Sequence, residues 1–352
     1  MHFSNLVAGL ALASSVIAAP KPKDVCKDDS LYKAMQQRGR SFIGTALTIH
    51  SNETKENSVI KQEFNSITPE NAQKWESTEP SRGNFTFEDS DRYVNYAKQH
   101  KIQIHCHNLV WHSQLPAWVT NGNFTNATLI EVMEDHIKGL AGRYKNDCTR
   151  WDVVNEALNE DGTYRESVWY TTIGEAYLPI AFKLAKKYSN AKLFYNDYNL
   201  EFNGNKTAGA ARIVKLIKSY GVHIDGVGYQ GHVTSEATPT APGPAPEQPV
   251  LEAALRATAD LGVDVVYTEI DVRFNTPATP ERTAAQVATY KRMAASCLAV
   301  KRCIGMTVWG ISDKYSWIPG VFAGEGSALL FDDNYEKKPA YAGFLAGITG
   351  KK

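Results

Sequence analysis

The sequence predicts an α/β protein with a single (β/α)8 (TIM) barrel. From Phe42 onward, eight short β-rich runs alternate with longer amphipathic segments, which is typical of repeated βα units on a parallel sheet. No glycine-rich phosphate-binding turn follows a strand and opens a helix, as an open dinucleotide-binding sheet would require. A chain of 352 residues can form one such barrel. We therefore expect the active site at the C-terminal ends of the strands.

Each strand candidate is a short run rich in β-branched and aromatic residues. In chain order the candidates are FIGTAL (42–47), FNSITPEN (64–71), IQIHCHNLVWH (102–112), RWDVVNE (150–156), AKLFYNDYN (191–199), GVGYQGH (226–232), VDVVYTEID (263–271) and CIGMTVWGISD (303–313). Helices are expected between them where apolar residues recur every three or four positions, as in 126–145 and 281–300. The Pro-rich segment 238–249 predicts a loop inserted after the sixth strand, because the βα pattern continues on both sides of it.

The N-terminal sequence predicts export. Residues 1–19 form an apolar run that ends in small residues before Pro20, too short to be a stable membrane span, so we expect a cleaved secretory signal and one extracellular domain over 20–352. Candidate N-glycosylation sequons fit this compartment and occur at Asn52, Asn84, Asn123, Asn126 and Asn205. The 38 basic and 38 acidic residues balance, so no overall field attracts nucleic acid or an anionic membrane.

The five cysteines suit an oxidising compartment. Cys297 and Cys303 bracket five residues, close enough for a local disulfide. The pairing of Cys26, Cys106 and Cys148 stays open, with one of the three left over. The sequence has no paired CxxC spacing, so we expect no structural zinc site.

Two glutamates end strands on different sides of the predicted barrel mouth. Glu156 closes the fourth strand, and Glu269 lies near the end of the seventh. Two facing carboxyl groups suit the cleavage of a glycosidic bond, in which one donates a proton and the other stabilises the transition state. The alternative is that both are ordinary strand-end glutamates paired with basic side chains. The Asn, His, Gln and Trp residues at the same strand ends favour the first interpretation.

Other strand-end residues support this interpretation. His232 could hydrogen-bond Glu269 while Asp271 holds the imidazole, although a lone buried histidine is usually structural. His105 and His107 share a strand face, which could indicate a metal site; hydrogen bonding inside the barrel is the simpler expectation, and we predict no metal. Tryptophans at strand ends provide faces for stacking sugar rings, although a core position is the default for each, Trp75 above all.

The ordered motifs ITPENAQKWE, HNLVWHSQLP, WDVVNEA, NDYN, GYQGH, TEID and VWGISDKYSW resemble those of glycoside hydrolase family 10, the endo-1,4-β-xylanases, over nearly all of residues 20–352. The resemblance implies a retaining enzyme in which Glu156 is the acid/base and Glu269 the nucleophile. His232 and Asp271 would support the nucleophile, and Asn155 would bind the sugar 2-hydroxyl. It also implies xylose-binding residues at Glu70, Asn71, Lys74, His107, Trp111, Gln114, Gln230, Trp309 and Trp317, and it supports a disulfide between Cys297 and Cys303.

The resemblance implies xylan as the partner. We expect no cofactor, because protonation and covalent displacement by carboxylates suffice for this reaction. We also expect no appended carbohydrate-binding module, and a monomer. Two departures from the family pattern touch no proposed catalytic atom: Cys106 stands where many members have Gly, and the loop 238–249 is longer than usual. The loop is expected at the rim of the binding face, where it could change how the substrate chain extends on the leaving-group side. One alternative is a glycosidase of the same mechanism that acts on another plant glycoside. A second is a catalytically silent carbohydrate-binding barrel, against which the presence of both glutamates argues.

Overall fold

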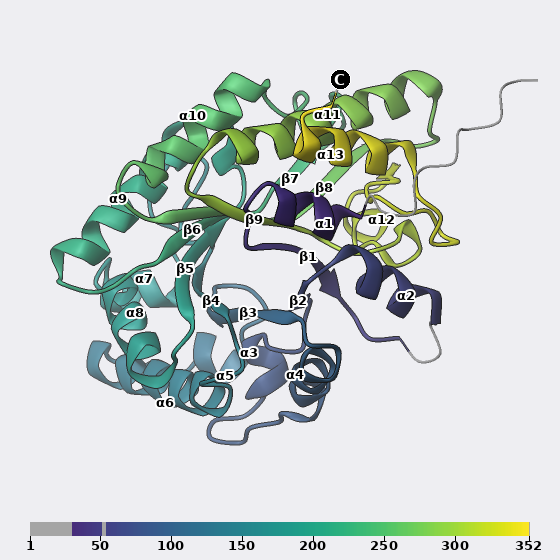
Figure 1. Ribbon diagram of the computed structural model, residues 1–352. Helices are drawn as coiled ribbons and strands as arrows, with labels where there is room; N and C mark the ends of the chain where they lie inside the picture. Colours follow the sequence, from purple (N-terminus) through teal and green to yellow (C-terminus); the bar gives the residue numbers. More distant parts are fainter. Residues whose placement is uncertain (1–29, 51–53, 352) are drawn as a thin grey trace, which may run out of the picture.

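Eight parallel strands close into a barrel, as the sequence predicted (Figure 1). The structure is a computed structural model and describes residues 30–50 and 54–351; the predicted signal peptide, Cys26 and Asn52 lie outside these ranges. Strand β9 pairs with both β8 and β1, which closes the ring. The barrel strands are β1 (Phe42–Leu47), β2 (Ser66–Pro69), β3 (Gln103–Val110), β4 (Arg150–Asn155), β5 (Lys192–Asp197), β6 (Gly226–Tyr229), β8 (Asp264–Asn275) and β9 (Cys303–Val308).

Two short strands lie outside the ring, and both pair with the C-terminal half of β8. Strand β7 (His232–Thr234) runs parallel to β8, and β10 (Glu325–Gly326) runs antiparallel to it. The predicted sixth strand, 226–232, is therefore interrupted at Gln230 and Gly231 between β6 and β7. This interruption lies at the rim where the candidate site residues gather.

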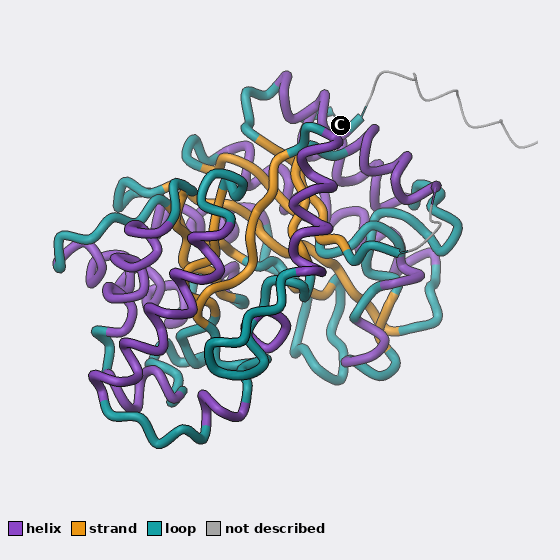
Figure 2. The backbone as a smooth tube through the Cα atoms, turned by 90° about the horizontal axis from the view of Figure 1, so that it is seen from below, coloured by secondary structure: helices purple, strands orange, loops and turns teal. Residues whose placement is uncertain are grey.

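Helices connect the strands and surround the barrel, so that the strands lie inside a layer of helices (Figure 2). The longer ones are α2 (Thr54–Glu63), α4 (Glu88–His100), α6 (Asn126–Arg143), α8 (Tyr177–Tyr188), α9 (Asn205–Ser219), α10 (Gln248–Ala259), α11 (Pro280–Ala299) and α13 (Pro339–Thr349). The shorter ones are α1 (Leu31–Gln37), α3 (Trp75–Thr78), α5 (Ala117–Thr120), α7 (Val168–Ile173), α12 (Ile318–Val321), and the 3-10 turns η1 (Leu200–Phe202) and η2 (Asp313–Tyr315).

Local sequence determines where these helices begin. Thr125 caps α6: its hydroxyl accepts the Thr128 amide, and the Thr128 hydroxyl accepts the Thr125 amide in return. Helix α10 begins at Gln248, so our assignment of 238–249 to a loop is wrong for its last two residues. Pro249 fits the first helical turn because amides there have no partner within the helix.

The N-terminal end of the barrel is closed by packed side chains. Phe42, Phe194 and Val266 form a buried cluster there, and the Arg150 guanidinium lies 3.7 Å from the centre of the Phe42 ring. A Cβ at Gly305 would lie 2.3 Å from that ring, so glycine is required for the close approach. This end is a packed core, and the opposite end is left for the candidate site.

Within residues 30–50 and 54–351, two disulfides hold the barrel. Cys297 and Cys303 are bonded, as predicted, between the end of α11 and the start of β9. The open pairing resolves to Cys106 with Cys148, which joins β3 to the segment before β4. Among the described residues, no helix is both long and apolar enough to cross a membrane. The sequon asparagines Asn84, Asn123, Asn126 and Asn205 are exposed.

Candidate active site

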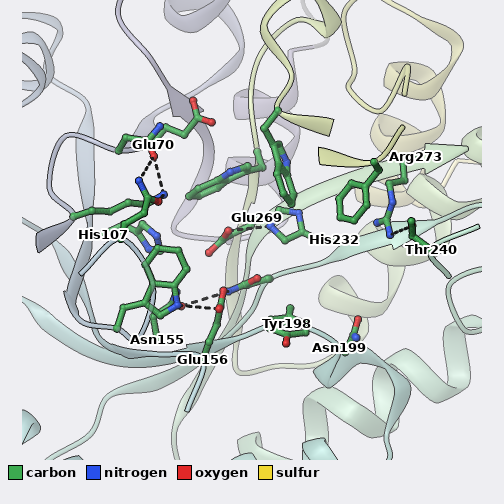
Figure 3. Close-up of a pocket in the computed structure, with 18 residues that line it drawn as sticks. Glu70, His107, Asn155, Glu156, Tyr198, Asn199, His232, Thr240, Glu269 and Arg273 are labelled. Atoms are coloured by element: carbon green, nitrogen blue, oxygen red, sulfur yellow. Dashed lines mark hydrogen bonds and ion pairs between the residues drawn. The ribbon is translucent and has the colours of Figure 1, made fainter. Parts of the chain in front are cut away.

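A cleft of about 530 Å³ opens at the C-terminal ends of the strands and brings the predicted residues together (Figure 3). Thirteen predicted site residues line it: Glu70, Asn71, Lys74, His107, Trp111, Gln114, Asn155, Glu156, Gln230, His232, Glu269, Trp309 and Trp317. Asp271 does not line the cleft and lies behind His232. Figure 3 shows Glu156 and Glu269 directed into the same space from different strands.

Glu156 follows β4 directly and has a left-handed backbone (φ 56°), which is uncommon for a residue with a side chain. Its amide donates to the Asn196 carbonyl of β5, so the turn is held by the neighbouring strand. One carboxylate oxygen accepts the Trp111 indole N–H at 2.9 Å, and the other accepts the Gln230 amide at 3.0 Å. Both contacts are made by neutral donors.

Glu269 lies within β8 and is only 4% exposed. One oxygen accepts the Asn196 amide at 2.8 Å, and the other lies 3.0 Å from Nε2 of His232. The second ring nitrogen of His232 lies 2.8 Å from Asp271, which shares the inward face of β8 with Glu269 by the two-residue period of a strand. Two carboxylates therefore hold one imidazole.

The surroundings favour an ionised Glu269. Burial alone would raise its pKa, but the hydrogen bond from His232 and the charges of His107 and His232 lower it overall. Burial likewise would lower the pKa of His232, whereas Asp271 and Glu269 raise it to about 10. The arrangement can therefore keep a carboxylate charged in an almost water-free position.

A lysine forms the centre of one side of the cleft. The Lys74 ammonium donates to Asn71 at 2.8 Å and to Gln114 at 2.6 Å, and it lies 5.1 Å from the centre of the Trp111 ring. Burial lowers the pKa of Lys74, and the carboxylates Glu269, Glu70 and Glu156 oppose that effect. These donors and acceptors match the hydroxyl groups of an uncharged sugar.

The comparisons with known proteins identify the family. The family model "Glycosyl hydrolase family 10" matches residues 30–346. The chain belongs to glycosyl hydrolase family 10. Its sequence is 57% identical to "Endo-1,4-beta-xylanase 2" of Aureobasidium pullulans, over 99% of this chain and 98% of that one.

Solved structures of family 10 agree with this fold. The structure of Penicillium canescens endo-1,4-beta-xylanase XylE is similar with a TM-score of 0.86 and 38% identity, over 92% of this chain and 98% of that one. Xylanase 10B of Thermotoga petrophila RKU-1, solved in complex with xylobiose, gives 0.85 and 36% over the same shares of the two chains.

Two histidines of this family 10 chain bind a carboxylate inside the barrel. A ring nitrogen of His105 lies 2.9 Å from Oδ1 of Asp152, and a ring nitrogen of His107 lies 2.9 Å from Oδ2. All three side chains are buried. This is the hydrogen-bonded arrangement that the sequence favoured over a metal site. In residues 30–50 and 54–351, no group of three His, Cys, Asp or Glu residues is arranged to hold a metal ion. Trp75 is buried, as expected, and stacks on His136 at 3.6 Å.

Six residues at this family 10 site were not among the predicted site residues. Asn196 connects the two halves of the site: its Nδ2 donates to Glu269, its Oδ1 accepts the Thr268 hydroxyl, and its side chain lies 2.9 Å from that of Asn155. Its place at the end of the fifth strand was the signal that could have identified it. The other five line the cleft and are Tyr198, Asn199, Thr240, Arg273 and Phe322.

Arg273 and Thr240 lie across the cleft from Glu70 and His107 (Figure 3). Arg273 donates to Glu325 at 2.7 Å, and the Thr240 hydroxyl donates to the other oxygen of the same carboxylate at 2.7 Å. Thr240 comes from the Pro-rich loop, which is therefore tied to the rim of the cleft. This loop contributes one residue, Thr240, to the lining of the site.

Proposed function

We propose that the protein is a secreted endo-1,4-β-xylanase that hydrolyses internal β-1,4-xylosidic bonds with retention of anomeric configuration. The observation that carries the proposal is the contrast between the two glutamates. Glu269 is buried and lies beside a histidine that a second carboxylate braces, whereas Glu156 accepts hydrogen bonds from neutral groups. The surroundings of Glu269 favour its ionised form, which suits a nucleophile, and we assign the proton transfer to Glu156.

The reaction follows from these roles in two displacements. Glu269 attacks the anomeric carbon while Glu156 protonates the departing glycosidic oxygen, so the bond to the leaving sugar breaks and a covalent glycosyl ester forms. Glu156, now ionised, then takes a proton from water, which attacks the same carbon and releases Glu269. Each displacement inverts the configuration, and two inversions give retention. The balance needs water alone, so we propose no cofactor.

The substrate is proposed from the relatives and from the cleft walls. The curated relative is described as an endo-1,4-beta-xylanase, and a similar solved structure contains xylobiose. Glu70, Asn71 and Lys74 would bind the xylose units on the non-reducing side, and Asn155 the reactive sugar's 2-hydroxyl. His107, Trp111 and Gln230 would complete its surroundings, while Gln114, Trp309 and Trp317 would crowd an exocyclic hydroxymethyl group and favour xylose over glucose.

Secretion and organisation belong to the same proposal. The apolar run 1–19 would direct export, and 20–352 would be a single catalytic domain that acts as a monomer. Two disulfides and the exposed sequon asparagines support an oxidising, extracellular location. His232 and Asp271 would support the nucleophile without touching the substrate.

The test is release of reducing ends from β-1,4-xylan by the wild-type protein, Glu269→Ala, and Glu131→Ala as a control on the outer surface of α6. We expect rapid loss of polymer length and short oligosaccharides with wild type and the control, and no hydrolysis with Glu269→Ala. Wild-type protein that leaves xylan intact but cleaves other plant glycosides would overturn the substrate assignment. Protein that cleaves neither would support the silent carbohydrate-binding alternative.

A further inference from the structure

The segment 230–232, from the residue after β6 to the first residue of β7, contacts both glutamates of the cleft through its first and last side chains. The Gln230 amide donates to Glu156, and His232 lies 3.0 Å from Glu269. Gly231 separates them, so its backbone conformation determines the relative directions of the two side chains. Any rotation at Gly231 would move one or both contacts.

The backbone of this segment is fixed at four points, three of them to neighbouring strands. The backbone N–H of Gln230 donates to the backbone carbonyl of Asp197. The backbone carbonyl of Gln230 accepts the backbone N–H of Glu269 at 2.7 Å. The Gly231 carbonyl accepts the Asp271 amide at 3.3 Å. Gly231 has φ 81°, and a Cβ there would lie 3.2 Å from Ile270 and Met293. The backbone N–H of Gly231 takes part in none of these three bonds to neighbouring strands.

The fourth point is a side chain that the mechanism does not use. Glu201, in η1 after β5, accepts the Gly231 amide at 2.7 Å. It is 1% exposed and does not line the cleft. Its other carboxylate oxygen is buried and has no hydrogen-bond partner among the described residues.

A buried carboxylate with a free oxygen is costly, because the group loses its hydration. Burial raises the pKa of Glu201 to about 7, against the hydrogen bonds from its own and the Gly231 amides and the charges of His232 and Lys206. A neutral amide would supply the same acceptor to Gly231 at lower desolvation cost. To hold the turn, residue 201 therefore needs only a side-chain oxygen that reaches the Gly231 N–H, and not a negative charge.

We propose that Glu201 is a positioning residue for the hydrolytic reaction. By holding the Gly231 amide, it fixes the turn that directs Gln230 to Glu156 and His232 to Glu269, and so sets the two carboxylates relative to each other. The inference rests on the proposed function, because it assigns the geometry of that same pair. It predicts an effect on the chemical step and little effect on sugar binding.

The experiment measures kcat and KM on xylohexaose for Glu201→Gln, Glu201→Ala and Glu201→Asp, with folding checked by circular dichroism. Gln keeps an acceptor at the same reach, Ala removes it, and Asp retracts it by one methylene. Leu200→Ala is the matched control, because it also removes buried side-chain volume from η1. We expect Glu201→Gln and Leu200→Ala to keep kcat within about twofold. Glu201→Ala and Glu201→Asp should lose about 10- to 100-fold in kcat, with KM nearly unchanged, as a small misplacement of reacting groups does.

Each outcome decides the proposal. Rescue by Gln together with loss in Asp and Ala supports it, and Asp alone suffices if the Ala variant does not fold. A Gln variant as impaired as the Asp variant, or an Asp variant with wild-type kcat, would overturn it. Wild-type enzyme that fails to hydrolyse xylohexaose would overturn the proposed function itself, whereas an active wild type beside an unimpaired Asp variant overturns the Glu201 inference alone.

Discussion

The Nε2 atom of His232 lies 3.0 Å from a carboxylate oxygen of Glu269. The opposite nitrogen of the ring lies 2.8 Å from Asp271, so the imidazole cannot rotate without losing one carboxylate. The pKa of His232 is raised to about 10 by these two carboxylates in spite of burial. The imidazole of His232 is therefore protonated, and positively charged beside the carboxylate, over the pH range in which Glu269 titrates.

Replacing His232 by Asn is expected to move the acidic limb of the kcat/KM profile to higher pH. Burial alone raises the pKa of Glu269, and the His232 hydrogen bond and charge lower it; without them the pKa rises, and a smaller fraction is ionised at any acidic pH. His107, Asp152 and Lys74 still interact electrostatically with the carboxylate. We expect a shift of about one pH unit or more, since a hydrogen bond to a charged group is worth about 1.5–3 kcal/mol.

The control for this shift is His223→Asn, which removes a largely exposed histidine paired with Asp225 before β6. The pH profile of xylohexaose hydrolysis is measured for both variants from pH 3 upward. The control should keep the wild-type limb. A His232→Asn enzyme with an unmoved acidic limb would show that His232 does not hold Glu269 in its ionised form.

Glu156→Ala should distinguish substrates by their leaving groups. Xylan needs a proton on the departing oxygen, so kcat/KM should fall by about 10²- to 10⁴-fold. Dinitrophenolate departs from a dinitrophenyl β-xylobioside without being protonated, so formation of the glycosyl ester should persist. Hydrolysis of that ester still needs Glu156 as a base, so a burst of dinitrophenolate should precede slow turnover. Stopped-flow absorbance measures the burst. Equal losses on both substrates, with Glu131→Ala unaffected, would argue against a proton-donating Glu156.

The two disulfides should contribute unequally to stability. Cys106 and Cys148 are 42 residues apart and Cys297 and Cys303 are six apart. The loop-entropy relation gives about 4 kcal/mol for the longer loop and about 2 kcal/mol for the shorter one. All four cysteines are buried, so alanine pairs remove similar packing. In urea unfolding, the free energy of unfolding of Cys106→Ala/Cys148→Ala should be lower than that of Cys297→Ala/Cys303→Ala. The reverse order would contradict the dependence on loop length.

The barrel could be predicted because its strands and helices differ in hydrophobic period along the chain. Residues such as Glu156 and Gln230 could be found for the same reason: they follow a strand directly, and parallel strands bring their ends to one rim. The local disulfide was visible because its two cysteines are six residues apart.

Other features depend on contacts that the linear sequence does not order. Cys106 reaches Cys148 only because β3 pairs with β4 in a register that places Ile104 beside Thr149. Arg273 enters the cleft because β8 continues past Glu269, beyond the point where the predicted strand ended. Thr240 reaches the rim because the Pro-rich loop folds back onto the end of β8. Nothing in its composition indicates that direction.

If Glu269 is the nucleophile of a double displacement, the first product keeps the β configuration, so the anomeric form of that product decides the role of Glu269. Proton NMR of xylohexaose hydrolysis, recorded in the first minutes before mutarotation, separates α and β reducing ends. We expect the β-anomer to appear first and the α-anomer to follow only by mutarotation. An α-anomer formed first would mean a single displacement by water and would contradict the role given to Glu269.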